Sequence, residues 1–164
     1  THTIAYTLRG LLESSSYLNL SLGRQVLTMV TTASENIMMR YERNKLDPYG
    51  DPEYLAARLD SRWKPETSYS CLTGNAQLAI IMLKLYRMAR DVRFLNSALK
   101  LIDQVKACQD LSSTNPGIRG GIAGSFPIWG EYAPYAFPNW AAKFFADAIM
   151  LQERILVEVR NCAR

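Results

Sequence analysis

Apolar residues recur at helical spacing in five segments of the chain. Positions three and four residues apart share one face of an α-helix, so each segment predicts a helix that buries one face. The predicted helices cover residues 3–17, 22–43, 74–89, 93–109 and 139–161. Thr73 and Asn139 are the predicted N-terminal caps of the third and fifth helices, because their short polar side chains can accept a bond from a free backbone N–H.

Two long segments, residues 45–70 and 110–138, interrupt this helical period and are rich in Gly, Pro and aromatic residues. The first opens with turn-forming residues at 47–52, and its residues 54–63 fit either an irregular strand or a short helix. The second is longer than the roughly 12–15 residues of an ordinary connection. Its aromatic content argues against disorder, so we expect residues 120–135 to form one wall of a ligand pocket.

The order of the elements predicts how they meet. Short connections join the first helix to the second and the third to the fourth, which predicts two antiparallel hairpins. Each long loop leads from the end of one hairpin to the start of the next, so both loops should lie at one end of the helices, here called the rim. The first, third and fifth helices begin there, which should bring His2, Asn75, Gln77 and Trp140 to the loops. The predicted fold class is all-α, with residues 1–164 in one domain.

Composition narrows the class of protein. Hydrophobic residues make up 48% of the 164 residues and charged residues 21%, as in globular proteins with a real core. No apolar run approaches the roughly 20 residues of a membrane-spanning helix. The net charge of +4 is too small to predict nucleic-acid binding. The basic residues Lys84, Arg87, Arg90 and Arg93 are interpreted as a solvated helix surface rather than a phosphate site.

The sequence predicts no metal and no cofactor. Its three cysteines, Cys71, Cys108 and Cys162, are far apart, and His2 is the only histidine, so the closely spaced ligand pairs of a zinc site are missing. We expect reduced and mostly buried thiols and a cytoplasmic location. The glycines at 120, 121 and 124 lack the following Gly-Lys-Ser/Thr of a phosphate-binding loop.

Helical hairpins with long loops on one rim resemble the α/α toroid of six-hairpin glycosidases, sugar epimerases and polysaccharide lyases. The residues at 63–65, 71–79, 124–127 and 138–141 (WKP, CLTGNAQLA, GSFP and PNWA) are also similar to bacterial proteins associated with polysaccharide biosynthesis. A complete toroid has more helices than this chain supplies. The resemblance therefore implies the C-terminal portion of a longer protein, or a chain completed by a second copy. A tetratricopeptide-like solenoid is the alternative fold, and the two long loops argue against it.

Glu131 is the best-placed candidate for a catalytic residue. It stands beside Trp129 and Tyr132 in the second loop, where apolar surroundings would keep its carboxyl group protonated and suit it to general acid catalysis. Asp60 is the candidate for the second carboxylate of glycoside hydrolysis, with Glu66 and Asp51 as alternatives. The competing interpretation for Glu131 is an exposed loop carboxylate or one that caps a neighbouring helix. For Asp51 it is a turn or a helix cap, and for Asp60 and Glu66 it is a surface ion pair with Arg62 or Lys64.

The candidate ligand-binding residues are mostly aromatic, because flat rings pack on the C–H faces of sugars. These rings are Trp63, Trp129, Tyr132, Tyr135 and Trp140. His2 could act as a base at a helix start, where the helix dipole lowers its pKa. Asn75 and Gln77 could bind sugar hydroxyl groups. Core packing for Trp140, capping for Asn75 and Gln77, and a frayed terminus for His2 remain open.

The expected function is that of a carbohydrate-active protein of bacterial polysaccharide metabolism, which holds a sugar chain in a groove at the rim. If catalytic, it would be a hydrolase or an epimerase. A non-catalytic glycan-binding or assembly factor and a helical protein-interaction module are the alternatives, and isoprenoid handling is a weaker one. The expected partners are a carbohydrate and, for a homodimer, a second copy; neither nucleic acid nor membrane is expected.

Overall fold

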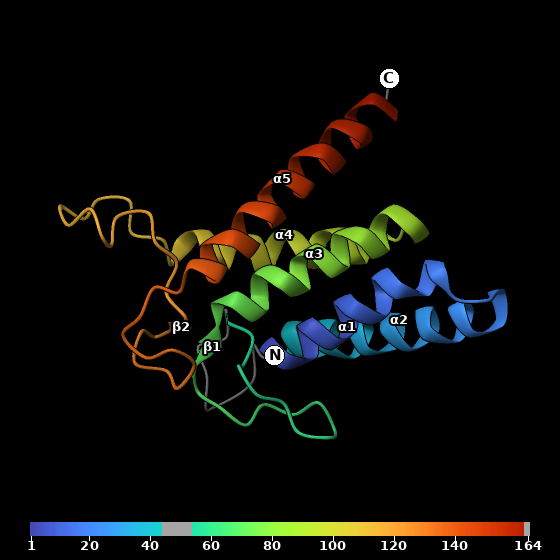
Figure 1. Ribbon diagram of the computed structural model, residues 1–164, viewed down its shortest axis with the longest axis horizontal. Helices are drawn as coiled ribbons and strands as arrows, with labels where there is room; N and C mark the ends of the chain where they lie inside the picture. Colours follow the sequence, from blue (N-terminus) through green and yellow to red (C-terminus); the bar gives the residue numbers. More distant parts are fainter. Residues whose placement is uncertain (44–53, 163–164) are drawn as a thin grey trace.

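The computed structural model describes residues 1–43 and 54–162, which form five α-helices and two short strands (Figure 1). The helices are α1 (His2–Ser14), α2 (Leu20–Arg43), α3 (Leu72–Ala89), α4 (Val92–Ala107) and α5 (Asn139–Cys162). A 3-10 turn, Ser15–Tyr17, follows α1. The strands β1 (Ser70–Cys71) and β2 (Ser125–Phe126) pair antiparallel. The prediction of an all-α fold is confirmed.

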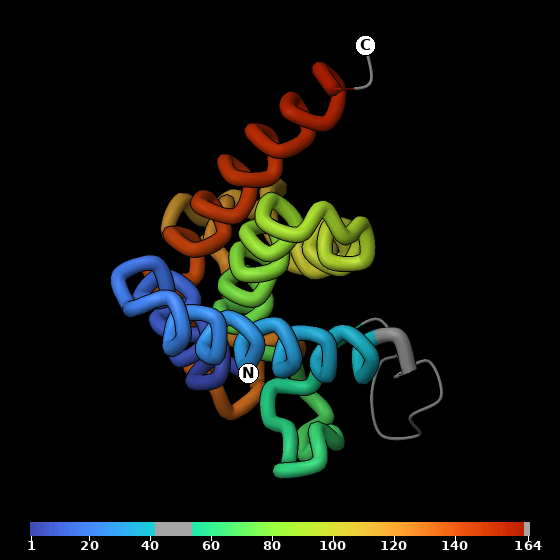
Figure 2. The backbone as a smooth tube through the Cα atoms, turned by 90° about the vertical axis from the view of Figure 1, so that its right-hand side faces the viewer, coloured from blue at the N-terminus to red at the C-terminus, as the bar shows by residue number. Residues whose placement is uncertain are grey.

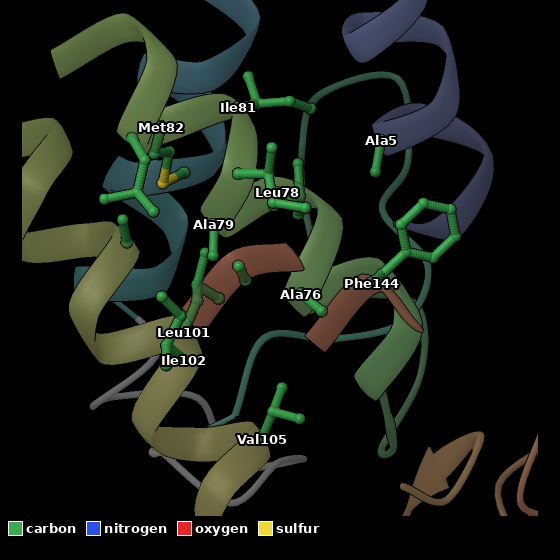
Figure 3. Packing of buried hydrophobic residues seen from close by; sticks show 14 of the residues in the cluster. Ala5, Ala76, Leu78, Ala79, Ile81, Met82, Leu101, Ile102, Val105 and Phe144 are labelled. Carbon is green, nitrogen blue, oxygen red and sulfur yellow. The ribbon is translucent and has the colours of Figure 1, made fainter. Parts of the chain in front are cut away.

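The central element is α3, which contacts all four other helices. Every residue from Leu72 to Leu83 is buried, because this stretch carries no charge before Lys84. A helix that is apolar on all sides must be covered on all sides. Figure 3 shows Leu78, Ile81 and Met82 of α3 among side chains of the surrounding helices. Those labelled around them include Ala5 of α1, Leu101, Ile102 and Val105 of α4, and Phe144 of α5.

Both hairpin turns are short. Asn19 precedes α2, and its side-chain oxygen accepts a 3.0 Å bond from the backbone N–H of Leu22, so this helix begins two residues before its predicted start. Arg90 ends α3 in the left-handed conformation, with φ 58°. Asp91 then caps α4 by accepting a 2.9 Å bond from the N–H of Arg93. These two residues reverse the chain between α3 and α4.

The helices α1, α3 and α5 begin at the end of the molecule that carries both long loops, and the two hairpin turns lie at the other end (Figure 1). The strands β1 and β2 join the loops, pairing Ser70 with Phe126 and Cys71 with Ser125. The backbone N–H of Leu72 extends this contact with a 3.1 Å bond to the carbonyl oxygen of Gly124. The rim of the structure comprises residues 54–70 and 108–138 together with these three helix starts.

Some predicted boundaries differ from the structure. Thr73 is not the cap of α3: the helix begins at Leu72, and the Cys71 sulfur accepts a 3.4 Å bond from the N–H of Gly74. The helix α4 ends at Ala107, two residues before its predicted end. Residues 54–63 form neither a helix nor a strand, and only an isolated bridge links Leu59 to Pro65. Residues 44–53, with the candidate Asp51, lie outside the described part of the chain.

The cysteines are free, but only Cys71 is buried; Cys108 is half-buried and Cys162 exposed. The expectation of mostly buried thiols is therefore wrong for two of the three. Among the helices that the structure describes, none combines the length and apolar character needed to cross a membrane.

The basic residues near the α3–α4 turn form ion pairs between helices. Lys84 contacts Glu13 of α1, Arg87 contacts Glu158 of α5, and Arg93 contacts Glu35 of α2 and the neighbouring Asp91. These pairs agree with the interpretation of a solvated helix surface. Beyond them, the C-terminal end of α5 extends past the other helices (Figures 1 and 2).

Candidate functional site

Three aromatic side chains from separate segments meet at the rim. Tyr132 lies in the second loop, His2 is the first residue of α1, and Trp140 lies in the first turn of α5. The Tyr132 phenol oxygen accepts a 2.9 Å bond from the Trp140 indole nitrogen. The same oxygen lies 3.3 Å from Nδ1 and 3.2 Å from Nε2 of His2, and the two rings are tilted with centroids 4.6 Å apart. We call these three residues the rim cluster.

Close backbone approaches fix the positions of these residues. A Cβ atom on Gly124 would lie 2.6 Å from the Tyr132 carbonyl oxygen, so the absence of a side chain lets the loop fold back on itself. The same carbonyl oxygen accepts a 2.7 Å bond from the Ser125 hydroxyl. At Gly74 a Cβ atom would lie 3.0 Å from the backbone nitrogen of His2. Glycine at these positions thus brings the loop and the start of α1 against the start of α3.

Tyr6 belongs to the same aromatic group, although the sequence did not identify it. Its ring stands edge-on to His2 at 4.7 Å and edge-on to Phe144 of α5 at 5.6 Å. Tyr6 follows His2 by four residues, and residues so spaced are neighbours on a helix surface. The four-residue spacing from His2 could therefore have predicted from the sequence that Tyr6 belongs to this group.

Burial lowers the pKa of one titratable group of the rim cluster and raises the pKa of the other. Desolvation lowers the pKa of His2 below its ordinary value, because removal from water disfavours the charged imidazolium. Desolvation also raises the pKa of Tyr132, and the hydrogen bond from Trp140 opposes this rise. Near neutral pH the site therefore holds an uncharged imidazole beside a phenol that keeps its proton.

Glu131 does not have the apolar surroundings that its sequence position predicts. Its side chain is 68% exposed and forms an ion pair with Arg58 from the first loop. The reason is tertiary, since the pairing of β1 with β2 brings the two loops together. Its assignment as a general acid stays a prediction.

Asp60 organises a turn. Its Oδ1 accepts 2.7 Å bonds from the backbone N–H groups of Arg62 and Lys64. The pKa of Asp60 is lowered, chiefly by the bond from Lys64, because hydrogen bonds to a carboxylate favour its charged form. The sequence interpretation for Asp60 was a surface ion pair with Arg62 or Lys64; the structure shows its carboxylate accepting bonds from the backbone N–H groups of those two residues. In residues 1–41 and 54–162 no aspartate or glutamate side chain is buried.

The remaining aromatic candidates differ in exposure. Trp129 is 65% exposed, Tyr135 72% and Trp140 47%. Trp63 is half-buried against the core and has a positive φ of 63°, so it belongs to the turn that Asp60 organises. The first three remain available to a ligand in solution, and Trp63 contributes to the core.

Asn75 and Gln77 lie beneath the rim surface and are fully buried. The Asn75 amide nitrogen donates 3.0 Å and 3.4 Å bonds to the Ser70 hydroxyl and the Gln104 side-chain oxygen. It thereby ties β1 to α4. Neither amide atom of Gln77 has a hydrogen-bond partner among the described residues. The proposed contact of these two residues with sugar hydroxyls stays a prediction, and their burial places them behind the rim cluster rather than in it.

Neither metal ligands nor known relatives identify the chemistry of the described site. The part of the chain that the structure describes contains no group of three or more His, Cys, Asp or Glu side chains that could hold a metal ion. Comparison with protein-family models, with curated proteins and with solved structures finds no match for this chain. The functional argument therefore rests on the geometry of the rim.

Proposed function

We propose that this is a carbohydrate-active protein of bacterial polysaccharide metabolism that binds a sugar chain across the rim. One observation carries the proposal: the rings of Trp129 and Tyr135, in the loop that carries Tyr132, and of Trp140, in the rim cluster, are exposed, and the cluster has hydrogen-bonding groups of its own. Exposed rings offer flat apolar faces to pyranose C–H groups, and phenol, indole and imidazole edges offer partners to hydroxyl groups.

The proposal extends to the fold, which we propose to be part of an α/α toroid. The two hairpins and α5 would form part of an α/α toroid, with the missing helices supplied by another segment or a second copy. The C-terminal end of α5, which extends beyond the other helices (Figure 2), supports this arrangement. Light scattering of the isolated chain should then show a dimer, or the chain should bind the helices that complete the toroid.

A non-catalytic glycan-binding factor is the second candidate, and the carboxylates favour it over a hydrolase. Glycoside hydrolysis commonly uses two carboxyl groups on either side of the scissile bond, one of them held protonated. Here Glu131 is exposed and paired with Arg58, and Asp60 holds a turn. A binder requires neither group.

The direct test is sugar binding by the intact chain and by Trp129→Ala. Calorimetry with a panel of acidic and neutral oligosaccharides should show binding, and removal of the ring should weaken it about tenfold, the size of one aromatic stacking contact. Tyr17→Ala is the matched control, because Tyr17 is 90% exposed and lies in the 3-10 turn between α1 and α2, away from the helix starts at the rim. Absence of binding to every oligosaccharide, or equal losses in both variants, would contradict the proposal.

Glu131→Gln tests its predicted role separately. If Glu131 is the general acid, any turnover of a bound sugar should disappear in this variant while binding persists. Unchanged turnover would remove Glu131 from the mechanism and leave it as the partner of Arg58.

A further inference from the structure

We propose that the end of the molecule opposite the rim docks on an anionic lipid surface. This end, here called the turn end, comprises the α1–α2 turn at residues 15–19, the α3–α4 turn at residues 90–91 and the adjoining helix ends (Figure 1). A 2.6 Å ion pair between Glu13 of α1 and Lys84 of α3 holds the two hairpins together near these turns. No residue of the rim takes part, so docking is independent of the proposed sugar binding.

Large apolar side chains protrude at the turn end. The exposed ones are Tyr17, Leu18, Leu20, Leu22, Met88 and Val92. Tyr17 is 90% exposed and Leu20 82%. Side chains exposed to this degree stand clear of their neighbours instead of lining a groove. They therefore suit a soft lipid interface, where tyrosine rings and leucine side chains partition favourably.

The polar side chains of the α1–α2 turn are paired within the turn. The hydroxyl groups of Ser14, Ser15 and Ser16 donate bonds of 3.1, 2.7 and 3.2 Å to the backbone carbonyl oxygens three residues earlier. The side-chain oxygen of Asn19 accepts a 3.0 Å bond from the backbone N–H of Leu22. Removing an unpaired polar group from water is costly, so these bonds lower the cost of placing the turn among lipid headgroups.

Positive charge exceeds negative charge at the turn end. Four carboxylates near it pair with four cations: Glu13, Glu35, Asp91 and Glu158 with Arg9, Lys84, Arg87 and Arg93. Arg24 and Arg90 are also exposed, and neither has a carboxylate partner in the part of the chain that the structure describes. The Arg90 guanidinium lies instead over the Tyr86 ring, 5.8 Å from its centroid. Anionic headgroups attract such basic side chains, so the charge favours an anionic lipid.

A second copy of the chain is the competing occupant of the turn end, and the charge argues against it. In a two-fold symmetric contact the same surface patch of each copy meets its counterpart. Arg24 and Arg90 would then face the positive charges of the other copy, and like charges repel across an interface. A lipid surface of opposite charge has no such penalty.

Docking of this kind needs no membrane-spanning segment. The expectation of no membrane partner rested on the lack of a long apolar run, and none of the described helices could cross a membrane. Shallow insertion of apolar side chains with basic residues nearby is a separate mode of membrane binding, and it requires no such run. The rim and its two long loops would then face away from the lipid (Figure 1).

Co-sedimentation of the intact chain with lipid vesicles tests the contact. One set of vesicles is phosphatidylcholine alone, and the other is equal parts of phosphatidylcholine and phosphatidylglycerol. We expect stronger binding to the anionic set, which weakens as salt screens the headgroups. Leu20→Ser should weaken this binding about tenfold, the size of burying one leucine side chain. Arg24→Gln should weaken it about fivefold, the size of one basic residue at an anionic surface.

The second loop supplies matched controls at the opposite end of the molecule. Leu111 is 68% exposed, and Arg119 is exposed in the same loop. Leu111→Ser and Arg119→Gln therefore remove the same kinds of side chain without touching the turn end. Both variants should bind the anionic vesicles as the parent chain does.

Absence of binding to the anionic vesicles, or equal binding to both sets, would overturn the docking. A loss in Leu111→Ser as large as that in Leu20→Ser would overturn it as well, because the contact would not lie at the turn end. A dimer in light scattering that Leu20→Ser dissociates would also overturn it, by assigning the turn end to a second copy. Oligosaccharide binding by Leu20→Ser should equal that of the parent chain, so docking and sugar binding can fail separately.

Discussion

The indole nitrogen of Trp140 donates a 2.9 Å hydrogen bond to the phenol oxygen of Tyr132, and this bond joins α5 to the loop that precedes it. Trp140 is 47% exposed, so its partner rather than burial fixes the indole. The same phenol oxygen faces His2. One side chain of the loop thus connects the starts of α1 and α5.

We expect this bond to be measurable by a double-mutant cycle. Trp140→Phe and Tyr132→Phe keep the rings and remove the donor and the hydroxyl group, respectively. Their unfolding free energies should be non-additive by about 0.5–1.5 kcal/mol, the net worth of one such bond. Trp140→Phe combined with Tyr17→Phe is the control and should be additive. Additivity in both cycles would show that the bond contributes nothing to stability.

The single histidine gives a direct test of the electrostatics. The only imidazole signals in a proton NMR spectrum belong to His2, and they should titrate with a pKa below the ordinary value of about 6.5, because burial disfavours the imidazolium. In denaturant the pKa should return to about 6.5. A folded-state pKa of His2 at or above its value in denaturant would show that burial does not disfavour the imidazolium.

The lowered pKa of His2 also makes stability depend on pH. A folded-state pKa below the unfolded one means that the unfolded chain binds the proton more readily. The contribution of His2 to stability is therefore full above the unfolded pKa and is lost as the pH falls through that value and then through the folded one. The difference in unfolding free energy between the parent chain and His2→Gln should accordingly shrink as the pH is lowered from about 7.5 through about 6.5. A difference that grows as the pH is lowered over this interval would mean that folding raises the pKa of His2 instead of lowering it.

Gly124 should not tolerate a side chain. In Gly124→Ala the added Cβ would meet the Tyr132 carbonyl oxygen at 2.6 Å and the Ala133 Cβ at 2.7 Å, so the loop must shift. We expect a loss of about 1–3 kcal/mol in unfolding free energy, as in overpacked sites, and a change in the titration of His2. Chemical denaturation and the NMR titration measure the two effects.

Gly10 is the matched control, because it lies inside α1 and a Cβ atom there would meet nothing within 4 Å. Gly10→Ala should raise stability by about 0.5–1 kcal/mol through helix propensity. An unchanged unfolding free energy in Gly124→Ala would mean that the backbone at residue 124 does not lie close to the Tyr132 carbonyl oxygen.

Arg90 ends α3 with a positive φ of 58°, a conformation that costs an L-residue about 1–2 kcal/mol and glycine almost nothing. Arg90→Gly should therefore be more stable than Arg90→Ala by about 1 kcal/mol. Both variants lose the contact of the guanidinium with the Tyr86 ring, so their difference isolates the backbone. Equal stability in thermal unfolding would show that the turn relaxes out of this conformation.

Much of the fold is determined by local pattern. The helix starts and ends were predicted to within about three residues in the described chain, because periodicity and capping act over one turn. Three capping errors have local causes. Cys71 rather than Thr73 caps α3, Asn19 caps the start of α2, and Asn139, predicted as the cap of α5, is the first residue of that helix. The uncharged stretch up to Leu83 could have predicted that α3 is buried on all sides. The sequence analysis predicted only that this helix buries one face.

The sequence by itself determined five helices, two hairpins and the gathering of aromatic residues in two loops, since these depend on neighbours in the chain. The tertiary structure decided which side chains meet. His2 and Tyr132 are 130 positions apart, and Arg58 and Glu131 are 73 apart. Whether Glu131 is buried or paired, and whether His2 has a partner, depends on how β1 and β2 bring the loops together. No local pattern encodes that contact, because it is fixed by packing all the helices around α3 at once.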